Sequence, residues 1–350
     1  MLKALQDVSI YLGNICNFNC TYCDRRYVKS MGNQTMAAFQ IPHLIDFFRK
    51  LETRPDMISF HGGEPFLYVD VMDGILTRLV ADLDYKPRVF IQTNGSLLLK
   101  HQDFLEKWKD FLFVSISFDF AFQGVNRTEF PIIESIRTLN SLGIGAQLQY
   151  VMPLNNKQVF SVKSVESILE VWRSCKVESL NLIPLRHIRG KDQFKVLLHE
   201  LNIQAVIHEL LRFMQILYVY GINIYVDGHS GAEIDKNYFV DHKQMVLSPD
   251  GYIYPEYDFL EYRVVGSRLG SWQGLIDIQR SNSHQEEMLV PKVCLTCPSK
   301  DTCGLKFLHS LFESEPQQDK CSTFYQGITI AVKHLAKLKS KQTLLQHLGV

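Results

Sequence analysis

The sequence predicts an α/β fold with a mainly parallel sheet. Strand-like segments alternate with amphipathic helical segments six times in the first 218 residues, which is typical of parallel strands joined by crossover helices. Six repeats are fewer than the eight that close a barrel, so we expect an open, partial (β/α)6 barrel. Cysteine-rich and glycine-rich turns follow the strands, at the edge where α/β proteins place their active sites.

The expected elements follow from residue periodicity. Runs of β-branched and aromatic residues bounded by Gly, Asn or Asp predict strands at 8–12, 57–60, 88–92, 113–119, 145–152 and 179–184. Apolar residues at helical spacing predict helices at 39–52, 70–83, 101–110, 131–142 and 162–174. A long helix at 200–218 and a strand at 221–226 end the repeats. We therefore expect a barrel domain at 1–230 and a smaller domain at 231–350.

Composition narrows the class of protein. The 350 residues carry 37 basic and 37 acidic side chains, so overall charge gives no argument for binding nucleic acid or a membrane surface. The chain opens without a secretory signal and contains no long apolar run, and we expect a cytoplasmic protein. Eight cysteines in such a chain favour metal binding over disulfides. Cys175 is isolated, and we expect it to be a small buried hydrophobic residue.

The first strand runs into a loop with three cysteines, Cys16, Cys20 and Cys23, at the spacing C-x3-C-x2-C. Thiolates suit zinc, copper(I) and iron–sulfur clusters. Zinc sites and ordinary cubane clusters normally take four protein ligands, so three crowded thiols predict a cluster with one open iron. Three structural cysteines, or a zinc site with a distant fourth ligand, are the alternatives.

Polar residues at the ends of the next strands are further candidates. Gly62 and Gly63 allow the backbone to approach a ligand closely, and Glu64 offers a carboxylate to a cationic group. Thr93-Asn94-Gly95 predicts a turn after the third strand. In the fourth segment Ser115, Ser117 and Asp119 alternate onto one face, and such groups suit ribose hydroxyls.

The cysteine loop, with the aromatic Tyr22 before its last cysteine, resembles the signature of radical S-adenosylmethionine (SAM) enzymes. The resemblance implies a [4Fe–4S] cluster on Cys16, Cys20 and Cys23, with the methionyl amine and carboxylate of SAM on the fourth iron. It further implies reductive cleavage of SAM to a 5′-deoxyadenosyl radical, which abstracts a hydrogen atom from the substrate. A flavodoxin or ferredoxin is the implied electron donor, and a TIM-like partial barrel is the implied fold.

Several turns match further motifs of this family. Gly-Gly-Glu-Pro is similar to its methionyl-amine motif, Ser-x-Asp to its ribose element, and Arg127 to an arginine that contacts the SAM carboxylate. Phe120 follows Asp119 where the family commonly has glycine, which weakens that assignment. The SAM-binding residues implied by the resemblance are Tyr22, Gly62, Gly63, Glu64, Asn94, Ser117, Asp119 and Arg127.

A second set of cysteines lies near the C-terminus: Cys294, Cys297, Cys303 and Cys321. Four thiols with a C-x-x-C nucleus suit zinc or a closed [4Fe–4S] cluster. A hairpin through Pro249-Asp250-Gly251 precedes them, and the whole resembles the SPASM extension of radical SAM enzymes, which usually holds two auxiliary clusters. Glu256 and Phe307 replace two expected cysteines, so we expect one auxiliary cluster and two [4Fe–4S] clusters in total.

The substrate is predicted only through the resemblance. Family members with this extension mostly modify peptides or proteins, so a peptide or protein side chain is the first expectation. No N-terminal segment here resembles a leader-peptide recognition domain, which keeps a small molecule, sugar or nucleotide as the alternative. A non-catalytic zinc-binding interaction protein is the second alternative.

Overall fold

The computed structural model describes residues 7–23, 34–51, 53–125, 127–154, 156–185, 187–189, 194–196, 200–226, 244–254, 270–272, 292–296, 317, 319–324, 326–330, 333 and 336–337. The chain divides into two compact units. Unit 1 comprises Met1–Ser117, Gly124–Gln147 and Tyr238–Glu286, and unit 2 comprises Phe118–Gln123, Leu148–Asn237 and Glu287–Val350.

Unit 1 contains a sheet built on four parallel strands, β1 (Asp7–Tyr11), β2 (Met57–His61), β3 (Arg88–Thr93) and β4 (Leu112–Ser117). The register pairs Tyr11 with His61 and Thr93 with Ile116, so neighbouring strands end together. Ile58, Ser59 and Phe60 of β2 are all buried, as expected for a strand covered on both faces.

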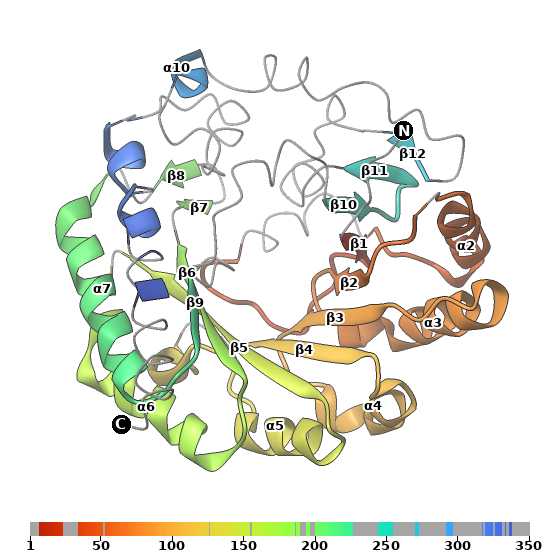
Figure 1. The fold of residues 1–350 in the computed structure, drawn as a ribbon, viewed down its shortest axis with the longest axis horizontal. Helices are drawn as coiled ribbons and strands as arrows, with labels where there is room; N and C mark the ends of the chain where they lie inside the picture. The colour runs from red at the N-terminus through yellow and green to blue at the C-terminus, as the bar shows by residue number, and fades with distance from the viewer. Residues whose placement is uncertain are drawn as a thin grey trace. The chain divides into compact units, whose positions relative to one another are not determined.

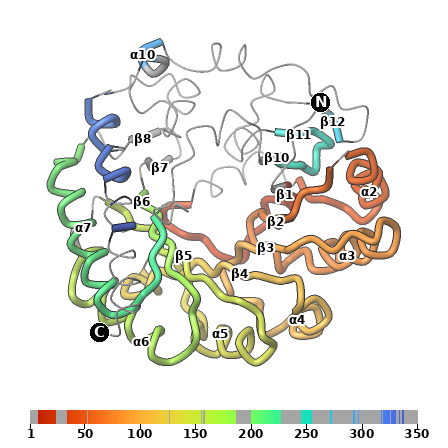
Figure 2. Tube along the Cα trace, viewed as in Figure 1, coloured from red at the N-terminus to blue at the C-terminus, as the bar shows by residue number. Residues whose placement is uncertain are grey.

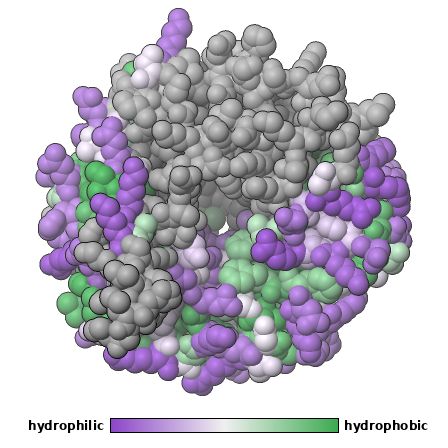
Figure 3. Space-filling view, in the orientation of Figure 1, coloured by the Kyte–Doolittle hydropathy of each residue, from purple (hydrophilic) through white to green (hydrophobic). Residues whose placement is uncertain are grey.

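Four helices of unit 1 lie along the outer side of these strands: α2 (Ile41–Lys50), α3 (Val69–Leu83), α4 (Gln102–Trp108) and α5 (Ile132–Ser141) (Figure 1). In α2, Leu44, Ile45, Phe47 and Phe48 are buried, and Pro42 occupies the first turn, where its missing N–H costs nothing. Hydrophilic side chains dominate the outer surface over α2 and α3 (Figure 3).

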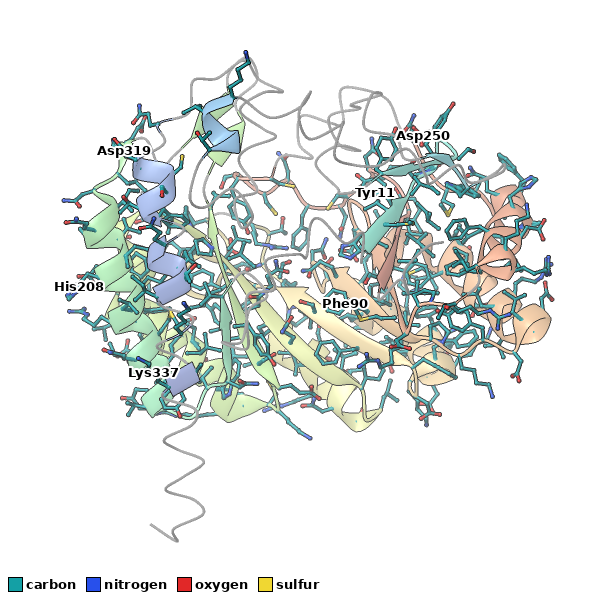
Figure 4. The ribbon with its side chains drawn as sticks, turned by 45° about the horizontal axis from the view of Figure 1, so that its top comes forward. Tyr11, Phe90, His208, Asp250, Asp319 and Lys337 are labelled. Atoms are coloured by element: carbon teal, nitrogen blue, oxygen red, sulfur yellow. The ribbon has the colours of Figure 1, made fainter. Side chains whose placement is uncertain are left out.

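A hairpin from the C-terminal part of the sequence completes this sheet. Strand β10 (Gln244–Leu247) pairs in parallel with β1, and β11 (Tyr252–Tyr254) and β12 (Gly270–Ser271) follow antiparallel (Figure 2). The side-chain amide of Gln40 donates to the Pro249 carbonyl at 2.8 Å and ties the turn to the segment before α2. Figure 4 shows Asp250 of this turn at the same end of the sheet as Tyr11.

Unit 2 continues the alternation with β5 (Gly145–Pro153, whose first three residues belong to unit 1), α6 (Val162–Ser174), β6 (Ser179–Leu185), α7 (Ile203–Val219) and β9 (Ile224–Val226). Strand order is β5-β6-β9, with β6 and β9 parallel. Ser161 caps α6 and Asn202 caps α7 through their side-chain oxygens. A separate antiparallel pair is formed by β7 (His187–Arg189) and β8 (Phe194–Val196).

The structure confirms the predicted fold class: the described strands form a mostly parallel α/β sheet with helices that is not closed into a barrel. All six predicted strands and all six predicted helices up to residue 219 are present within a few residues. One strand end was wrong, since β4 stops at Ser117 and not at Asp119. None of the helices in the described residues is long and apolar enough to span a membrane.

The boundary predicted at residue 230 stays a prediction, because residues 227–243 lie outside the described part of the chain. The helix predicted at 326–341 is present in residues 326–330 and at 333 and 336–337, with Lys333 and Lys337 exposed. A helical stretch at 319–324 precedes it, and residue Gly327 packs on α7, where an added Cβ would lie 2.6 Å from Ile207.

Candidate active site

The three N-terminal cysteines lie on the loop that leaves the carboxyl end of β1. The loop begins with two backbone bonds, from the Leu12 N–H to the His61 carbonyl at 2.8 Å and from the Met36 N–H to the Leu12 carbonyl at 2.8 Å. Cys20 is buried, and Cys16 and Cys23 are partly exposed. The Cys23 N–H donates to the Cys20 carbonyl at 3.3 Å, so these two cysteines lie on one tight turn.

The donor set of this loop suits an iron–sulfur cluster, because three soft thiols share one short turn and none forms a disulfide. Among the described residues, however, no three His, Cys, Asp or Glu side chains are already grouped as a metal site. Cys16, Cys20 and Cys23 are the residues of this loop that would hold the cluster.

The Gly-Gly-Glu segment at the end of β2 is bonded directly to the cysteine loop. The Gly63 N–H donates to the Gly13 carbonyl at 2.7 Å, and the Glu64 N–H donates to the Ile15 carbonyl at 2.9 Å. A Cβ at Gly63 would lie only 2.2 Å from that Ile15 oxygen, and one at Gly62 would lie 2.7 Å from the Gly13 oxygen. Only glycine permits this close approach of two backbones.

The Glu64 carboxylate is fully buried and accepts three hydrogen bonds. One oxygen takes the Thr93 hydroxyl at 2.6 Å and the Phe66 N–H at 3.0 Å, and the other takes the Asn94 N–H at 2.7 Å. Burial raises the pKa of Glu64, while these hydrogen bonds and the Arg127 charge act in the opposite direction. Glu64 thus joins the ends of β2 and β3, and its contact with a methionyl amine stays a prediction.

Asn94 connects the end of β3 to the cysteine loop. Its amide nitrogen donates to the Asn17 side-chain oxygen at 2.8 Å and lies 3.8 Å from the Cys16 sulfur. The Asn17 amide in turn donates to the Ser96 hydroxyl at 2.9 Å. The predicted turn residue therefore lies against the predicted cluster ligand.

Arg127 and Tyr22 also meet at this loop. The Arg127 guanidinium donates to the Tyr22 hydroxyl at 3.3 Å and lies 5.8 Å from the centre of the Phe18 ring. Phe18 is buried and packs on Phe130 with a ring separation of 6.2 Å. The structure thus places the predicted Arg127 and Tyr22 in one cluster with the cysteine loop, and their contact with SAM stays a prediction.

The two predicted ribose residues are placed differently. Ser117 is the last residue of β4, and its hydroxyl accepts a hydrogen bond from the Gln92 amide at 2.8 Å. Asp119 lies beyond the strand, so its assignment to the strand face of Ser115 and Ser117 was wrong. It is fully buried, and its backbone carbonyl accepts the Phe122 N–H in the first turn of the 3-10 helix η5 (Phe120–Phe122).

Phe120 occupies the backbone conformation that glycine favours. Its φ angle is +49°, and its ring packs edge-on against Phe118 at 5.0 Å and Tyr150 at 5.3 Å. Phe120 stands where the resemblance led us to expect glycine, and its positive φ is the conformation that glycine adopts without strain.

The C-terminal cysteines are described only in part. Cys294 lies in the short helix α10 (Lys292–Leu295), and Cys297, Cys303, Glu256 and Phe307 lie outside the described residues. Cys321 is buried on the helical stretch at 319–324. Cys175 is partly exposed and not buried as expected, because it ends α6 and its thiol donates to the Val171 carbonyl at 3.2 Å.

The fold and the site define an α/β protein in which a three-cysteine loop is held by the ends of neighbouring parallel strands. Residues 10–158 match the model of the radical SAM superfamily. This part of the chain therefore matches the family that the cysteine loop predicted.

Curated relatives match a shorter stretch. The chain is 38% identical over 84 residues to 7-carboxy-7-deazaguanine synthase of Methanothermobacter thermautotrophicus, and 36% identical over 89 residues to that of Clostridium acetobutylicum. These matches cover 23% and 25% of this chain and 30% and 36% of the two relatives. The chain therefore spans about a third of the length of the curated relatives it matches.

Solved structures share the fold over most of the chain. Native anSMEcpe with bound AdoMet superposes with a TM-score of 0.67 at 17% identity, covering 97% of this chain and 99% of the other. Streptococcus suis SuiB bound to its precursor peptide SuiA gives a TM-score of 0.63 at 16% identity, covering 86% and 71%. At these identities the likeness establishes the fold alone.

Asn17 and Ser96 organise the site but were not singled out in the sequence, and Thr93 was named only as part of a turn. Their positions in the sequence could have identified them, because each is a polar residue within one or two places of a predicted site residue. Which of these polar side chains would meet could not be predicted, since the contact joins two loops separated by 77 residues in the case of Asn94 and Asn17.

Proposed function

We propose that this protein reductively cleaves SAM to methionine and a 5′-deoxyadenosyl radical and then removes a hydrogen atom from a peptide or protein side chain. The observation that carries the proposal is the joining of three strand ends: the cysteine loop of β1, Gly-Gly-Glu of β2 and Thr-Asn-Gly of β3 share one hydrogen-bond network. Such a network holds a reactive group in one geometry, which is what the chemistry of a radical requires.

Cys16, Cys20 and Cys23 would hold a [4Fe–4S] cluster, which supplies one electron to the bound SAM. Gly62 and Gly63 bring backbone close to the cysteine loop, and we assign the methionyl end to this place. Ser117 and Asp119 are the proposed ribose contacts. Arg127 and Tyr22, which are joined by a hydrogen bond at the cysteine loop, are proposed to contact SAM as well. An external reductant of the flavodoxin or ferredoxin class supplies the electron.

A peptide substrate is supported by the fold shared with SuiB, whose structure holds a precursor peptide, and with anSMEcpe, which was solved with the Cp18Cys peptide. We assign residues 231–350 to a SPASM-like domain with one auxiliary [4Fe–4S] cluster on Cys294, Cys297, Cys303 and Cys321. That cluster would be closed by protein ligands and would transfer electrons or support the cavity. Zinc is the other metal that suits these thiols.

A small-molecule substrate is the second candidate, because both curated relatives are 7-carboxy-7-deazaguanine synthases. Their matches cover about a quarter of this chain, so they bear on only part of it. A zinc-binding protein without catalysis is the third candidate.

Anaerobic reconstitution with iron and sulfide, followed by reduction in the presence of SAM, tests the activity. We expect about eight irons per chain if both clusters form, together with 5′-deoxyadenosine detected by mass spectrometry. The triple variant C16A/C20A/C23A should make none, whereas Cys175→Ala, which removes a cysteine outside both sets, should behave as wild type. Zinc retention without SAM cleavage by the wild-type protein would contradict the proposal.

Deuterium transfer separates the substrate classes. Host cells grown in heavy water supply a labelled extract that is divided by size into a protein and peptide fraction and a small-molecule fraction. We expect the label to enter 5′-deoxyadenosine only from the protein and peptide fraction. Label that enters only from the small-molecule fraction would replace the peptide assignment with the second candidate.

A further inference from the structure

Three side chains form a closed hydrogen-bond ring beside Cys16. The Asn94 amide donates to the Asn17 oxygen at 2.8 Å, the Asn17 amide donates to the Ser96 hydroxyl at 2.9 Å, and this hydroxyl donates to the Asn94 oxygen at 2.7 Å. Every bond in the ring runs in the same sense, so each donor polarises the next. The ring connects the turn after β3 to the cysteine loop after β1.

The orientation of the Asn94 amide is fixed by a backbone donor. Its oxygen accepts the Ser96 N–H at 3.0 Å, and a backbone N–H can only donate. The nitrogen of the amide must therefore face the cysteine loop. One of its two hydrogens serves Asn17, and the other is directed toward the Cys16 sulfur at 3.8 Å.

The backbone of Asn94 is also fixed by a hydrogen bond. Its backbone N–H donates to the buried Glu64 carboxylate at 2.7 Å, and the residue is only 5% exposed. A second donor, the Phe18 N–H, lies 3.4 Å from the same Cys16 sulfur. Cys16 thus receives one N–H from its own loop and one from the turn after β3.

We propose that Asn94 is a positioning residue for Cys16, and that its N–H raises the reduction potential of the cluster that this loop would hold. Reduction by one electron increases the negative charge on the cluster and its thiolates, and an N–H donor stabilises that charge. Removing the donor lowers the potential and loosens the ligand. This inference rests on the proposed function, since it requires a cluster on Cys16, Cys20 and Cys23.

The test compares Asn94→Ala with Ser96→Ala in reconstituted protein. Redox titration is followed by the electron paramagnetic resonance signal that changes when SAM is added, because that signal reports only the SAM-binding cluster. We expect Asn94→Ala to shift the midpoint potential to more negative values and to release iron to a chelator about 10-fold faster. Ser96→Ala keeps the Asn94 nitrogen beside the sulfur, and its potential should stay close to that of wild type.

Asn17→Ala provides a second variant, because Asn17 is exposed and its side-chain oxygen accepts the hydrogen bond that holds the Asn94 amide nitrogen. We expect a smaller shift of the potential in the same direction. A wild-type potential in both Asn94→Ala and Asn17→Ala would overturn the inference while leaving the proposed function intact. A wild-type protein without any SAM-sensitive signal would instead overturn the proposed function, and this inference with it.

Discussion

The Glu64 N–H donates to the Ile15 carbonyl at 2.9 Å, one residue before Cys16. This bond joins the turn after β2 to the first cysteine of the loop after β1. Two motifs that are 48 residues apart, measured from Cys16 to Glu64, are therefore parts of one backbone arrangement.

Gly63→Ala should uncouple the two loops. The new Cβ would lie 2.2 Å from the Ile15 oxygen, so one backbone must move away. We expect SAM cleavage to fall by about 100-fold or more, since a misplacement of about 1 Å can cost that much. Circular dichroism checks that the fold is retained, and product formation is measured by mass spectrometry.

Gly143→Ala is the matched control for this substitution. Gly143 has a φ of +76° and no neighbour within 4 Å of an added Cβ. It should lose about 1 kcal/mol of stability from backbone strain and keep its SAM cleavage. Equal losses of activity in the two variants would show that the contact with Ile15 does not account for the loss at Gly63.

Glu64→Gln should alter the pH dependence of stability. The folded-state pKa of Glu64 is raised above 4.5 by burial, so the folded protein binds this proton more tightly than the unfolded chain. The contribution of Glu64 to the free energy of unfolding is therefore largest at low pH and falls as the pH rises through the raised pKa. Glutamine does not titrate, and the variant lacks this slope.

Urea unfolding of metal-free protein at several pH values measures this effect. The wild-type free energy of unfolding minus that of Glu64→Gln should decrease as the pH rises above about 4.5. A difference that increases with pH would mean that the hydrogen bonds from Thr93 and Asn94 outweigh burial.

Phe120 offers a test of backbone strain, because glycine should give a more stable protein than alanine at this position. Alanine and glycine at this position both remove the ring and its contacts with Phe118 and Tyr150. Because φ is +49°, glycine should be more stable than alanine here by about 1 kcal/mol. Chemical denaturation of Phe120→Gly and Phe120→Ala measures the difference, and a more stable alanine variant would refute the strain.

Arg127→Lys should loosen the cysteine loop while keeping the charge. Lysine cannot reproduce both the bond to Tyr22 and the position over the Phe18 ring, so we expect a loss of about 1 kcal/mol in stability. Arg127→Met removes the charge as well and should raise the pKa of Glu64 further. If the two variants have the same stability at every pH, the Arg127 charge has no effect on Glu64.

The sequence predicted the parallel strands and their helices because each segment carries its own periodicity. It also located the cysteine loop, Gly-Gly-Glu and Thr-Asn-Gly at strand ends, and the shared register of β1 to β4 brings those ends together. Asp119 was placed on the wrong element because alternation continues through residue 119 in the sequence, whereas hydrogen bonding of β4 stops at Ser117.

Other features could not be predicted because they depend on partners distant in the sequence. The hairpin at Pro249-Asp250-Gly251 was expected, but the parallel pairing of β10 with β1 was not. Glu64 looked like a ligand for a cation, and its burial with three protein donors follows only from the meeting of β2 and β3. The short pair β7 and β8 was missed because three residues are too few to predict a strand.

The most direct test of the central claim is a hyperfine measurement on the reduced N-terminal cluster. SAM labelled with nitrogen-15 in its amino group is added to reconstituted protein, and electron–nuclear double resonance is recorded. We expect a coupling from the labelled nitrogen in wild type and none in C16A/C20A/C23A. A reconstituted wild-type cluster without this coupling would mean that no iron is open to SAM and would contradict the account.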